Sequence, residues 1–477
     1  MALLLWPLVC LVLFRSMKLE RAVIWSLIGG YLLLPPVASF DLPLVPPLDK
    51  SSIPSVSVFL ICLVFLGRNM SVWPHSKLAR LLLAGFVIGS VPTVLANSDA
   101  VVFEVFANSD PISFPAWSLP GLGLRDVASA FGGQVIAILP FLLARHLLAT
   151  EDNIRELLLA IVIAALVYSV PALIEIRLSP QINTWVYGFF QHEFVQTMRS
   201  GGFRPIVFLE HPLWLAIFVV AALLSATALM KASVDERRVR FVLAMIYLAG
   251  LLYLCKSLAS FAYGVCLVPV VLFAGMRLQI KIAVAFALAA VIYPLLRGVG
   301  WVPVEDILEW ANSVNPARAA SLAYRFETET LLLERASERP WVGWGGWGRN
   351  LIHDSETGEL LTIPDGRWII VFGTYGWLGY VCEFGLLSLP IFLLGRAALN
   401  ASGHHISPYA AAAVLILGIN MVDMLLNAAL TPITWMLAGA GLGYAERLKL
   451  QQKADAAVTL RPAIGTVAKD RVPTTIM

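Results

Sequence analysis

Long apolar runs separated by short polar loops fill most of this chain. In lipid every backbone polar group must be satisfied within the protein, so a membrane-spanning helix needs roughly 20 mostly apolar residues. Thirteen runs have this character, and the first and third are short. They lie near residues 1–14, 22–38, 54–67, 78–96, 126–149, 156–176, 205–230, 239–255, 258–276, 279–298, 368–395, 408–427 and 431–446.

The first run can span a membrane only if Arg15 and Lys18 extend to the headgroup layer, so the pattern predicts 12 or 13 transmembrane helices. We therefore expect an all-α polytopic membrane protein with one large, partly helical outer loop. Its expected parts are ten helices in residues 1–298, the outer loop in 299–366, three last helices in 367–446 and a flexible tail in 447–477.

Basic residues gather in one alternate set of loops, which predicts orientation because cytoplasmic loops carry an excess of Lys and Arg. This set includes Arg237, Arg238 and Arg240, and the segment after the last run adds Arg447 and Lys449. The opposite short loops hold fewer basic residues. We expect a cytoplasmic C-terminus and an outer loop that faces the periplasm, in the inner membrane of a bacterium.

Composition agrees with the pattern and excludes several classes of protein. Hydrophobic residues make up 59% of the 477 positions and charged residues only 14%, with a mean hydropathy of +0.79, which leaves too little polar surface for a soluble protein. The net charge is +3, and no large basic cluster indicates nucleic-acid binding. The five cysteines fall in or beside the predicted spans without metal-ligand spacing, as core residues do.

Water-facing residues are concentrated between Gly300 and Leu387. Asn315-Pro316 is a helix-start signal, and the Arg-rich helix that follows is expected to stop before Pro340. Arg318 and Arg325 lie seven residues apart, on one face of that helix. Paired guanidinium groups suit a diphosphate, since each remains charged and can bond two oxygens at once. The alternative is that these arginines anchor the helix at the headgroup layer.

Arg199 and Arg204 present the same two alternatives. They flank a Gly-containing turn just before the span that starts near residue 205, on the predicted outer side. Charged residues near lipid are costly, so outward arginines at a helix end are candidates for function even when they are few.

A turn rich in Gly and Trp, from Trp341 to Gly348, follows the Arg-rich helix. Its glycines allow backbone N–H groups to approach an anion, and the faces of Trp344 and Trp347 suit a sugar ring or a polyprenyl chain. An aromatic belt at the membrane surface is the competing interpretation. Arg367, at the point of re-entry, is a further candidate for substrate binding.

Asp365 precedes the re-entry point, where partial burial raises a carboxyl pKa into the range useful for a base. A solvated turn aspartate is the alternative, and His211 and His353 are the other candidate bases. Within the spans, Asp423 and Glu383 carry two interpretations, helix–helix hydrogen bonding and proton-coupled transport.

Asp365-Gly366, nine further residues and Gly376-Trp-Leu-Gly379 form a spaced motif at the end of the outer loop. This motif resembles that of the bacterial O-antigen ligase and polysaccharide polymerase superfamily, membrane-embedded C-type glycosyltransferases that act on polyprenyl-diphosphate-linked sugars. The family's ligases carry a His-Asn pair, nine residues and Gly-x-x-Gly at the end of a large periplasmic loop. Asp365 stands in place of that histidine, so the chain looks more like the polymerase or exopolysaccharide branch.

Three upstream segments fit the same resemblance. The segment from Arg199 to His211-Pro212 is similar to the family's arginine motif before a span, and Tyr324-Arg325 with the following Pro-x-x-Gly turn is similar to its loop arginine. Lys256-Ser257 weakly matches a short outward Ser-Arg turn.

The resemblance implies transfer of glycan repeat units from a polyprenyl diphosphate to a sugar hydroxyl, in exopolysaccharide or O-antigen biosynthesis. An O-antigen ligase and a flippase or transporter of lipid-linked oligosaccharide are the alternatives. The expected partners are the polyprenyl-diphosphate-linked oligosaccharide, membrane lipid and a chain-length regulator. No outward carboxylate cluster has metal-ligand character, so we expect a reaction without metal or cofactor. The expected roles are catalysis for Asp365 and Arg325, diphosphate binding for Arg199, Arg204 and Arg318, and substrate binding for Trp344, Trp347 and Arg367.

Overall fold

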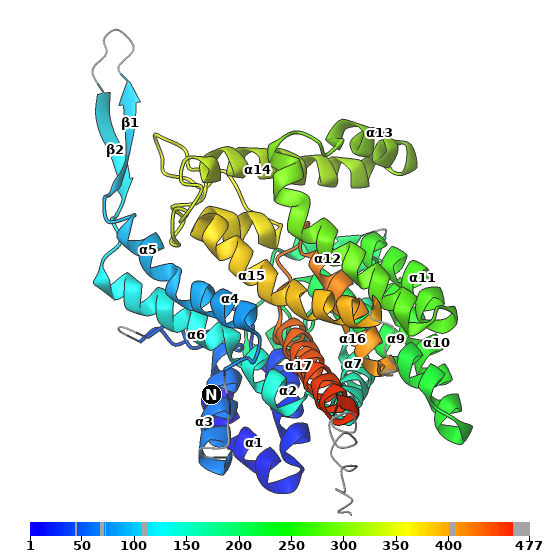
Figure 1. Ribbon diagram of the computed structural model, residues 1–477. Helices are drawn as coiled ribbons and strands as arrows, with labels where there is room; N and C mark the ends of the chain where they lie inside the picture. The colour runs from blue at the N-terminus through cyan, green and yellow to red at the C-terminus, as the bar shows by residue number, and fades with distance from the viewer. Residues whose placement is uncertain are drawn as a thin grey trace, which may run out of the picture.

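Helices make up most of the computed structural model, which describes residues 1–42, 45–66, 71, 73–106, 113–199, 201–399 and 406–460 (Figure 1). The helices before the outer loop are α1 (Ala2–Ser16), α2 (Leu19–Leu33), α3 (Ser52–Leu66), α4 (Lys77–Ile88), α5 (Ser90–Leu95), α6 (Leu124–Leu147), α7 (Glu151–Arg177), α8 (Ile182–Tyr187), α9 (Pro212–Ala232), α10 (Asp235–Leu254), α11 (Leu258–Phe273) and α12 (Met276–Gly298). They are followed by α13 (Val304–Val314), α14 (Pro316–Ser337), α15 (Arg367–Leu399), α16 (Pro408–Asp423) and α17 (Pro432–Leu460).

Each of the thirteen predicted runs coincides with a helix, the run at 78–96 with α4 and α5 together. Within the described residues, six helices are long and apolar enough to cross a membrane, as expected of an all-α multi-pass membrane protein: Lys77–Leu95, Leu124–Leu147, Glu151–Arg177, Pro212–Ala232, Met276–Gly298 and Arg367–Leu399. Four shorter helices are also apolar. A count of 12 or 13 spans therefore stays a prediction.

The core of the bundle is built around α9 and α16. Helix α9 is buried along nearly its whole length and packs against α7, α10, α11 and α16. Small residues let α16 approach its neighbours closely, because a glycine or alanine keeps the backbones near each other. At Gly418, an added Cβ would lie 3.2 Å from the Cα of Ala283 on α12.

The strands form two small antiparallel pairs. Strands β1 (Val101–Phe106) and β2 (Ser113–Leu119) form a hairpin that projects from the bundle at the end where α13 and α14 lie (Figure 1). Strands β3 (Met198–Arg199) and β4 (Gly202–Phe203) pair across the predicted Arg199 turn, just after the 3-10 helix Phe194–Thr197.

Helices α13 and α14 make the outer loop largely helical. The Asn315 side chain accepts a hydrogen bond from the Arg318 backbone N–H at 3.1 Å, and Pro316 occupies the first turn, which confirms the predicted helix start. Helix α14 ends at Ser337, before Pro340 as predicted.

Helix α15 is broken at Gly376, whose backbone is left-handed with φ of 64°. The Gly/Trp turn fills the break. The Trp377 N–H donates to the Pro340 carbonyl at 2.7 Å, and the Trp344 N–H donates to the Gly373 carbonyl at 2.9 Å. An added Cβ at Gly376 would lie 2.4 Å from the carbonyl carbon of Trp341, so glycine is required for both the bend and the contact.

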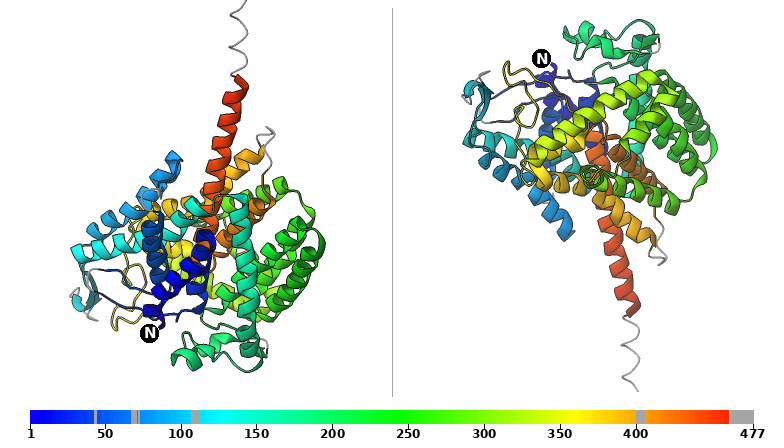
Figure 2. Two further views of the ribbon diagram at one scale, coloured as in Figure 1. Left: turned by 90° about the horizontal axis from the view of Figure 1, so that it is seen from below. Right: turned by 90° about the horizontal axis from the view of Figure 1, so that it is seen from above.

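The predicted tail begins later than expected. Helix α17 continues to Leu460 and projects beyond the bundle (Figure 2), so residues 447–460 are helical. Residues 461–477 lie outside the described residues.

Candidate active site

Four arginines from two distant parts of the chain lie close enough to influence one another electrostatically. Arg199 and Arg204 come from the segment around β3 and β4, and Arg318 and Arg325 come from α14. Burial lowers the pKa of Arg199, and the charges of Arg318 and Arg325 lower it further. We call these four residues the arginine cluster. The sequence motifs that carry them lie more than a hundred residues apart, and the fold joins them.

Arg204 is the most buried member of the cluster, with 3% of its surface exposed. Burial, followed by repulsion from Arg199, lowers the pKa of its guanidinium to about 10, so it is still charged at neutral pH. Its Nε and Nη2 atoms have no hydrogen-bond partner among the described residues. A buried charge with unpaired donors is costly, and such a group is expected where a ligand supplies the missing acceptors.

The segment that carries Arg204 is fixed by contacts from other elements. The Glu175 carboxylate on α7 accepts hydrogen bonds from the backbone N–H groups of Ile206 and Val207, both at 2.8 Å. The Lys50 ammonium donates to the Phe208 carbonyl at 2.9 Å. These bonds hold Val207 in a left-handed backbone conformation, with φ of 54°. The position of Arg204 is therefore set before any ligand binds.

Arg199 is held in a similar way from the α10–α11 turn. The Lys256 ammonium donates a hydrogen bond to the Arg199 carbonyl at 3.0 Å. Lys256 itself has a left-handed backbone, with φ of 52°, which turns the chain sharply between the two helices. The weak Lys256-Ser257 match in the sequence thus marks a turn that touches the arginine cluster.

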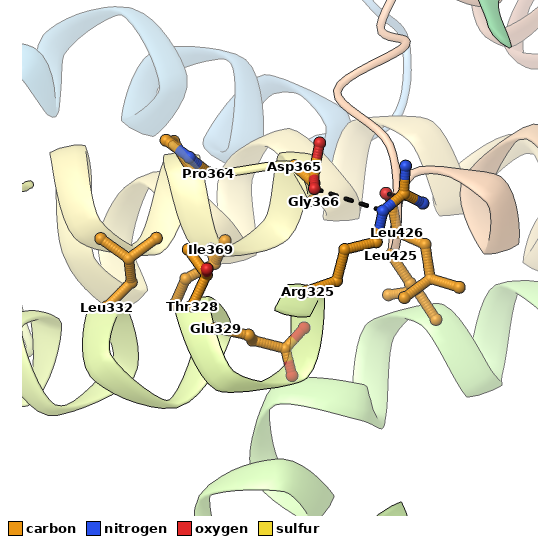
Figure 3. Close-up of a pocket in the computed structure, with 10 residues that line it drawn as sticks. All are labelled: Arg325, Thr328, Glu329, Leu332, Pro364, Asp365, Gly366, Ile369, Leu425 and Leu426. Carbon is orange, nitrogen blue, oxygen red and sulfur yellow. Dashed lines mark hydrogen bonds and ion pairs between the residues drawn. The ribbon is translucent and has the colours of Figure 1, made fainter. Parts of the chain in front are cut away.

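Arg325 connects the arginine cluster to Asp365 (Figure 3). Its Nε lies 3.2 Å from Oδ2 of Asp365, and its Nη1 donates to the Leu426 carbonyl at 3.2 Å and to Oδ1 of Asn427 at 3.4 Å. Asn427 in turn donates from Nδ2 to Oδ1 of Asp423 at 3.0 Å. The chain of contacts fixes the plane of the Arg325 guanidinium beside the carboxylate.

Asp365 and Arg325 line a small pocket between α14 and the start of α15. Its wall mixes polar and apolar side chains, and its lining residues are Arg325, Thr328, Glu329, Leu332, Pro364, Asp365, Gly366, Ile369, Leu425 and Leu426 (Figure 3). The Asp365 side chain is 40% exposed. Burial of the remainder raises its pKa, while Arg325 opposes this shift. Asp365 is thus a partly exposed carboxyl whose pKa lies above its usual value.

Glu329 anchors this part of α14, and the sequence analysis did not single it out. Its carboxylate accepts hydrogen bonds from Arg297 Nε at 2.7 Å, Tyr293 Oη at 3.0 Å and Trp368 Nε1 at 3.1 Å. It lies four residues after Arg325, on the same helix face. That spacing is the signal in the sequence that could have identified it.

Two of the predicted substrate-binding residues are instead engaged within the protein. Trp344 is 7% exposed, and the guanidinium groups of Arg335 and Arg339 both lie over its ring, at 3.4 Å and 4.3 Å from the ring centre. Arg367 forms a two-pronged ion pair with buried Glu383, at 2.7 Å and 2.6 Å. We leave both out of the candidate site, because neither has a surface or a donor pair free for a substrate.

Trp347 is 57% exposed, but it lies in the Gly/Trp turn rather than in the pocket. That turn packs near Arg335, ten residues after Arg325 on α14. At a rise of about 1.5 Å per residue this is a separation of about 15 Å along the helix. The structure therefore does not place Trp347 beside the arginine cluster.

His353 is held in the outer loop and does not reach the pocket. Its Nε2 lies 2.9 Å from the Gly348 carbonyl, and its ring packs against Trp117 and Phe103 of the hairpin. His211, the other candidate base, lies near the arginine cluster. Among the described residues no group of three or more His, Cys, Asp or Glu side chains is placed to hold a metal ion.

No protein-family model matches the chain, and a search of curated proteins finds no match either.

Proposed function

We propose that this protein is a membrane polysaccharide polymerase that transfers glycan repeat units from a polyprenyl diphosphate to a sugar hydroxyl, without metal or cofactor. The observation that carries the proposal is the arginine cluster, above all the buried Arg204 guanidinium with two unpaired donor atoms. A diphosphate diester offers two negative charges and several acceptor oxygens. It therefore satisfies both the charge and the donors.

The site supports a direct displacement. The acceptor hydroxyl oxygen forms a bond to the anomeric carbon, the bond from that carbon to the diphosphate oxygen breaks, and the hydroxyl proton moves to Asp365. Polyprenyl diphosphate leaves with the electron pair. Arg325 lies beside Asp365 and near Arg199, the part of the arginine cluster where negative charge increases as the bond to the leaving group breaks. Fixed cations stabilise such a charge strongly when they are already in place.

The proposal includes the finer topology that the sequence predicts. The shorter apolar helices complete a bundle of 12 or 13 spans in a bacterial inner membrane, and the outer loop faces the periplasm. The arrangement supports this, because α13, α14 and the β1–β2 hairpin gather at one end while the C-terminal part of α17 projects away from them (Figures 1 and 2).

A transporter that uses Asp423 and Glu383 as proton carriers is the weaker proposal. The Glu383 carboxylate forms an ion pair with Arg367, and the Asp423 carboxylate accepts a hydrogen bond from Asn427 beside the site. Glu383 is thus fully paired, whereas Asp423 is paired at Oδ1 and has no partner for Oδ2 among the described residues. A ligase would use the same donor and differ in the acceptor.

The test is a polymerisation assay with the purified protein in detergent. Polyprenyl-diphosphate-linked repeat units from the source bacterium are added, and product length is followed on a gel. Unaltered protein should give a ladder, whereas Arg325→Ala and Asp365→Ala should each reduce it by about 100-fold or more, because a cation on the leaving group and a base on the acceptor are lost.

Arg177→Gln is the matched control, since Arg177 is an exposed arginine at the end of α7. It should leave the ladder unchanged. A single transfer to lipid A core without a ladder would indicate a ligase. Movement of the lipid across vesicles with no new glycosidic bond would replace the enzyme with a flippase.

A further inference from the structure

His211 has an unusual position between the arginine cluster and the start of α9. It is the residue that caps α9, and its Nδ1 accepts a hydrogen bond from the Leu213 backbone N–H at 3.0 Å. Its ring meets that of His192 edge to face, with ring centres 4.8 Å apart. An imidazole nitrogen that accepts a hydrogen bond carries no proton, so the cap fixes Nδ1 as the bare nitrogen.

The neighbouring groups that shift the pKa of His211 all act in one direction. Burial, followed by His192, Arg204, Arg325 and Arg199, lowers its pKa to about 3. The imidazole is therefore neutral at neutral pH, as the cap geometry also requires. With Nδ1 bare, the single ring proton resides on Nε2.

Among the described residues the ring's hydrogen bond is the one at Nδ1, which leaves the Nε2–H group able to donate to a ligand. Three guanidinium groups, those of Arg199, Arg204 and Arg325, lie near enough to lower the pKa of His211, so an anion held by the arginine cluster can offer an acceptor to the Nε2–H group. A neutral donor also binds such an anion without adding a fifth positive charge to the repulsion there.

We propose that His211 binds the diphosphate of the donor substrate as a neutral hydrogen-bond donor through Nε2–H, with its Nδ1 fixed by the helix cap. The inference rests on the proposed function, since it uses the same anion site. It assigns His211 a binding role in place of the base role that its residue type suggested.

Two variants distinguish the role of the Nε2–H donor of His211 from the role of its Nδ1 as the cap of α9. In His211→Asn the short amide retains the cap on α9 but cannot reach as far as Nε2. In His211→Gln the longer amide can place an N–H near the Nε2 position but loses the cap. The probe is a short-chain prenyl diphosphate diester of a sugar, whose affinity is measured by calorimetry in detergent.

We expect His211→Asn to weaken binding at least about tenfold, as for the loss of a hydrogen bond to a charged group. His211→Gln should recover most of this affinity despite a lower Tm. An affinity of His211→Asn equal to that of the unaltered protein would overturn the inference. So would equal losses in the two variants, because the cap alone would then explain them.

A pH series distinguishes a neutral donor from an imidazolium. Both phosphates of a diester stay ionised from about pH 5 to about pH 8, so an affinity independent of pH over this range is expected for a neutral His211. A fall in affinity as pH rises through about 6.5, absent from His211→Asn, would show a charged imidazole and overturn the inference.

Arg204→Gln distinguishes this failure from a failure of the proposed function. If unaltered protein does not bind the diester, or Arg204→Gln binds it equally well, the proposal that the arginine cluster binds a diphosphate is rejected. If Arg204→Gln weakens binding and His211→Asn does not, only the role of His211 fails.

Discussion

The protein has two groups of arginines that can be compared. One is the arginine cluster, and the other, which we call the hairpin-side group, consists of Arg335, Arg339 and Arg349 near the base of the β1–β2 hairpin. In the second group Arg349 donates to the carbonyls of Pro120 and Asp99 at 2.8 Å and 2.9 Å. Arg339 donates to the carbonyl of Ala96 and to Asn97. Most of these donors have partners, and only Nε of Arg349 is recorded as buried without one.

The difference shows how to separate a structural arginine from a binding arginine. The hairpin-side group ties the Gly/Trp turn to residues 96–99 and 120, and its charges are solvated by backbone carbonyls. In the arginine cluster, Arg204 keeps two unpaired donors in a buried place. Arg204 and Arg349 are both buried arginines, so neither residue type nor burial tells them apart. The number of donor atoms that have a partner within the protein indicates whether such an arginine is structural or is available to a ligand.

Among the arginines of the two groups, Arg204 is expected to have the largest effect on ligand affinity when it is replaced by Gln. Loss of a buried cation should weaken binding of the prenyl diphosphate diester by about tenfold or more, because hydrogen bonds to charged groups are the strong ones. The same change should raise the Tm of the empty protein, since an unpaired buried charge is removed. Calorimetry and thermal unfolding in detergent measure the two, and a lower Tm with unchanged affinity would make Arg204 a structural residue.

Arg349→Gln should give the opposite pair of results. Its two carbonyl partners would be left buried without donors, and we expect the free energy of unfolding to fall by about 2 kcal/mol. Affinity for the diester should stay within about twofold of the unaltered value. Denaturant unfolding and calorimetry measure the two quantities, with Arg177→Gln as the control for a charge change at an exposed site. Loss of affinity at full stability would extend the binding site to the hairpin.

The smallest effect concerns the pH dependence of transfer. Burial raises the pKa of Asp365 and Arg325 opposes the rise, so removal of Arg325 should raise the pKa further. The carboxylate form, which accepts the proton, is then lost at a higher pH. The acid limb of kcat/KM in Arg325→Gln should therefore move to higher pH, measured on residual activity with excess enzyme. A limb that stays in place would mean that another group takes the proton.

Local features of the fold could be predicted from the sequence, because they depend on neighbouring residues. The apolar runs placed thirteen helices, and Asn315-Pro316 marked the start of α14. The Arg318 and Arg325 pair followed from helical periodicity alone. The apolar runs could not establish how many helices cross the membrane, since length and composition qualify six of them in the described part of the chain.

Tertiary features could not be predicted in the same way. Whether Arg367 is free depends on Glu383, sixteen residues away, and whether Trp344 is free depends on how Arg335 and Arg339 fold around it. The meeting of Arg204 with Arg325 depends on the packing of distant elements. The sequence shows that a position is Trp or Arg, but it does not show whether that side chain contacts a ligand or another part of the chain.

The break in α15 has a consequence for how the protein is made. A helix interrupted at Gly376 exposes backbone groups that lipid cannot satisfy, and residues 340–345 supply the partners. Those residues precede α15 in the chain, so the ribosome has synthesised them before the break emerges. During membrane insertion, residues of the outer loop are thus already available to form hydrogen bonds with the backbone groups that the break in α15 exposes.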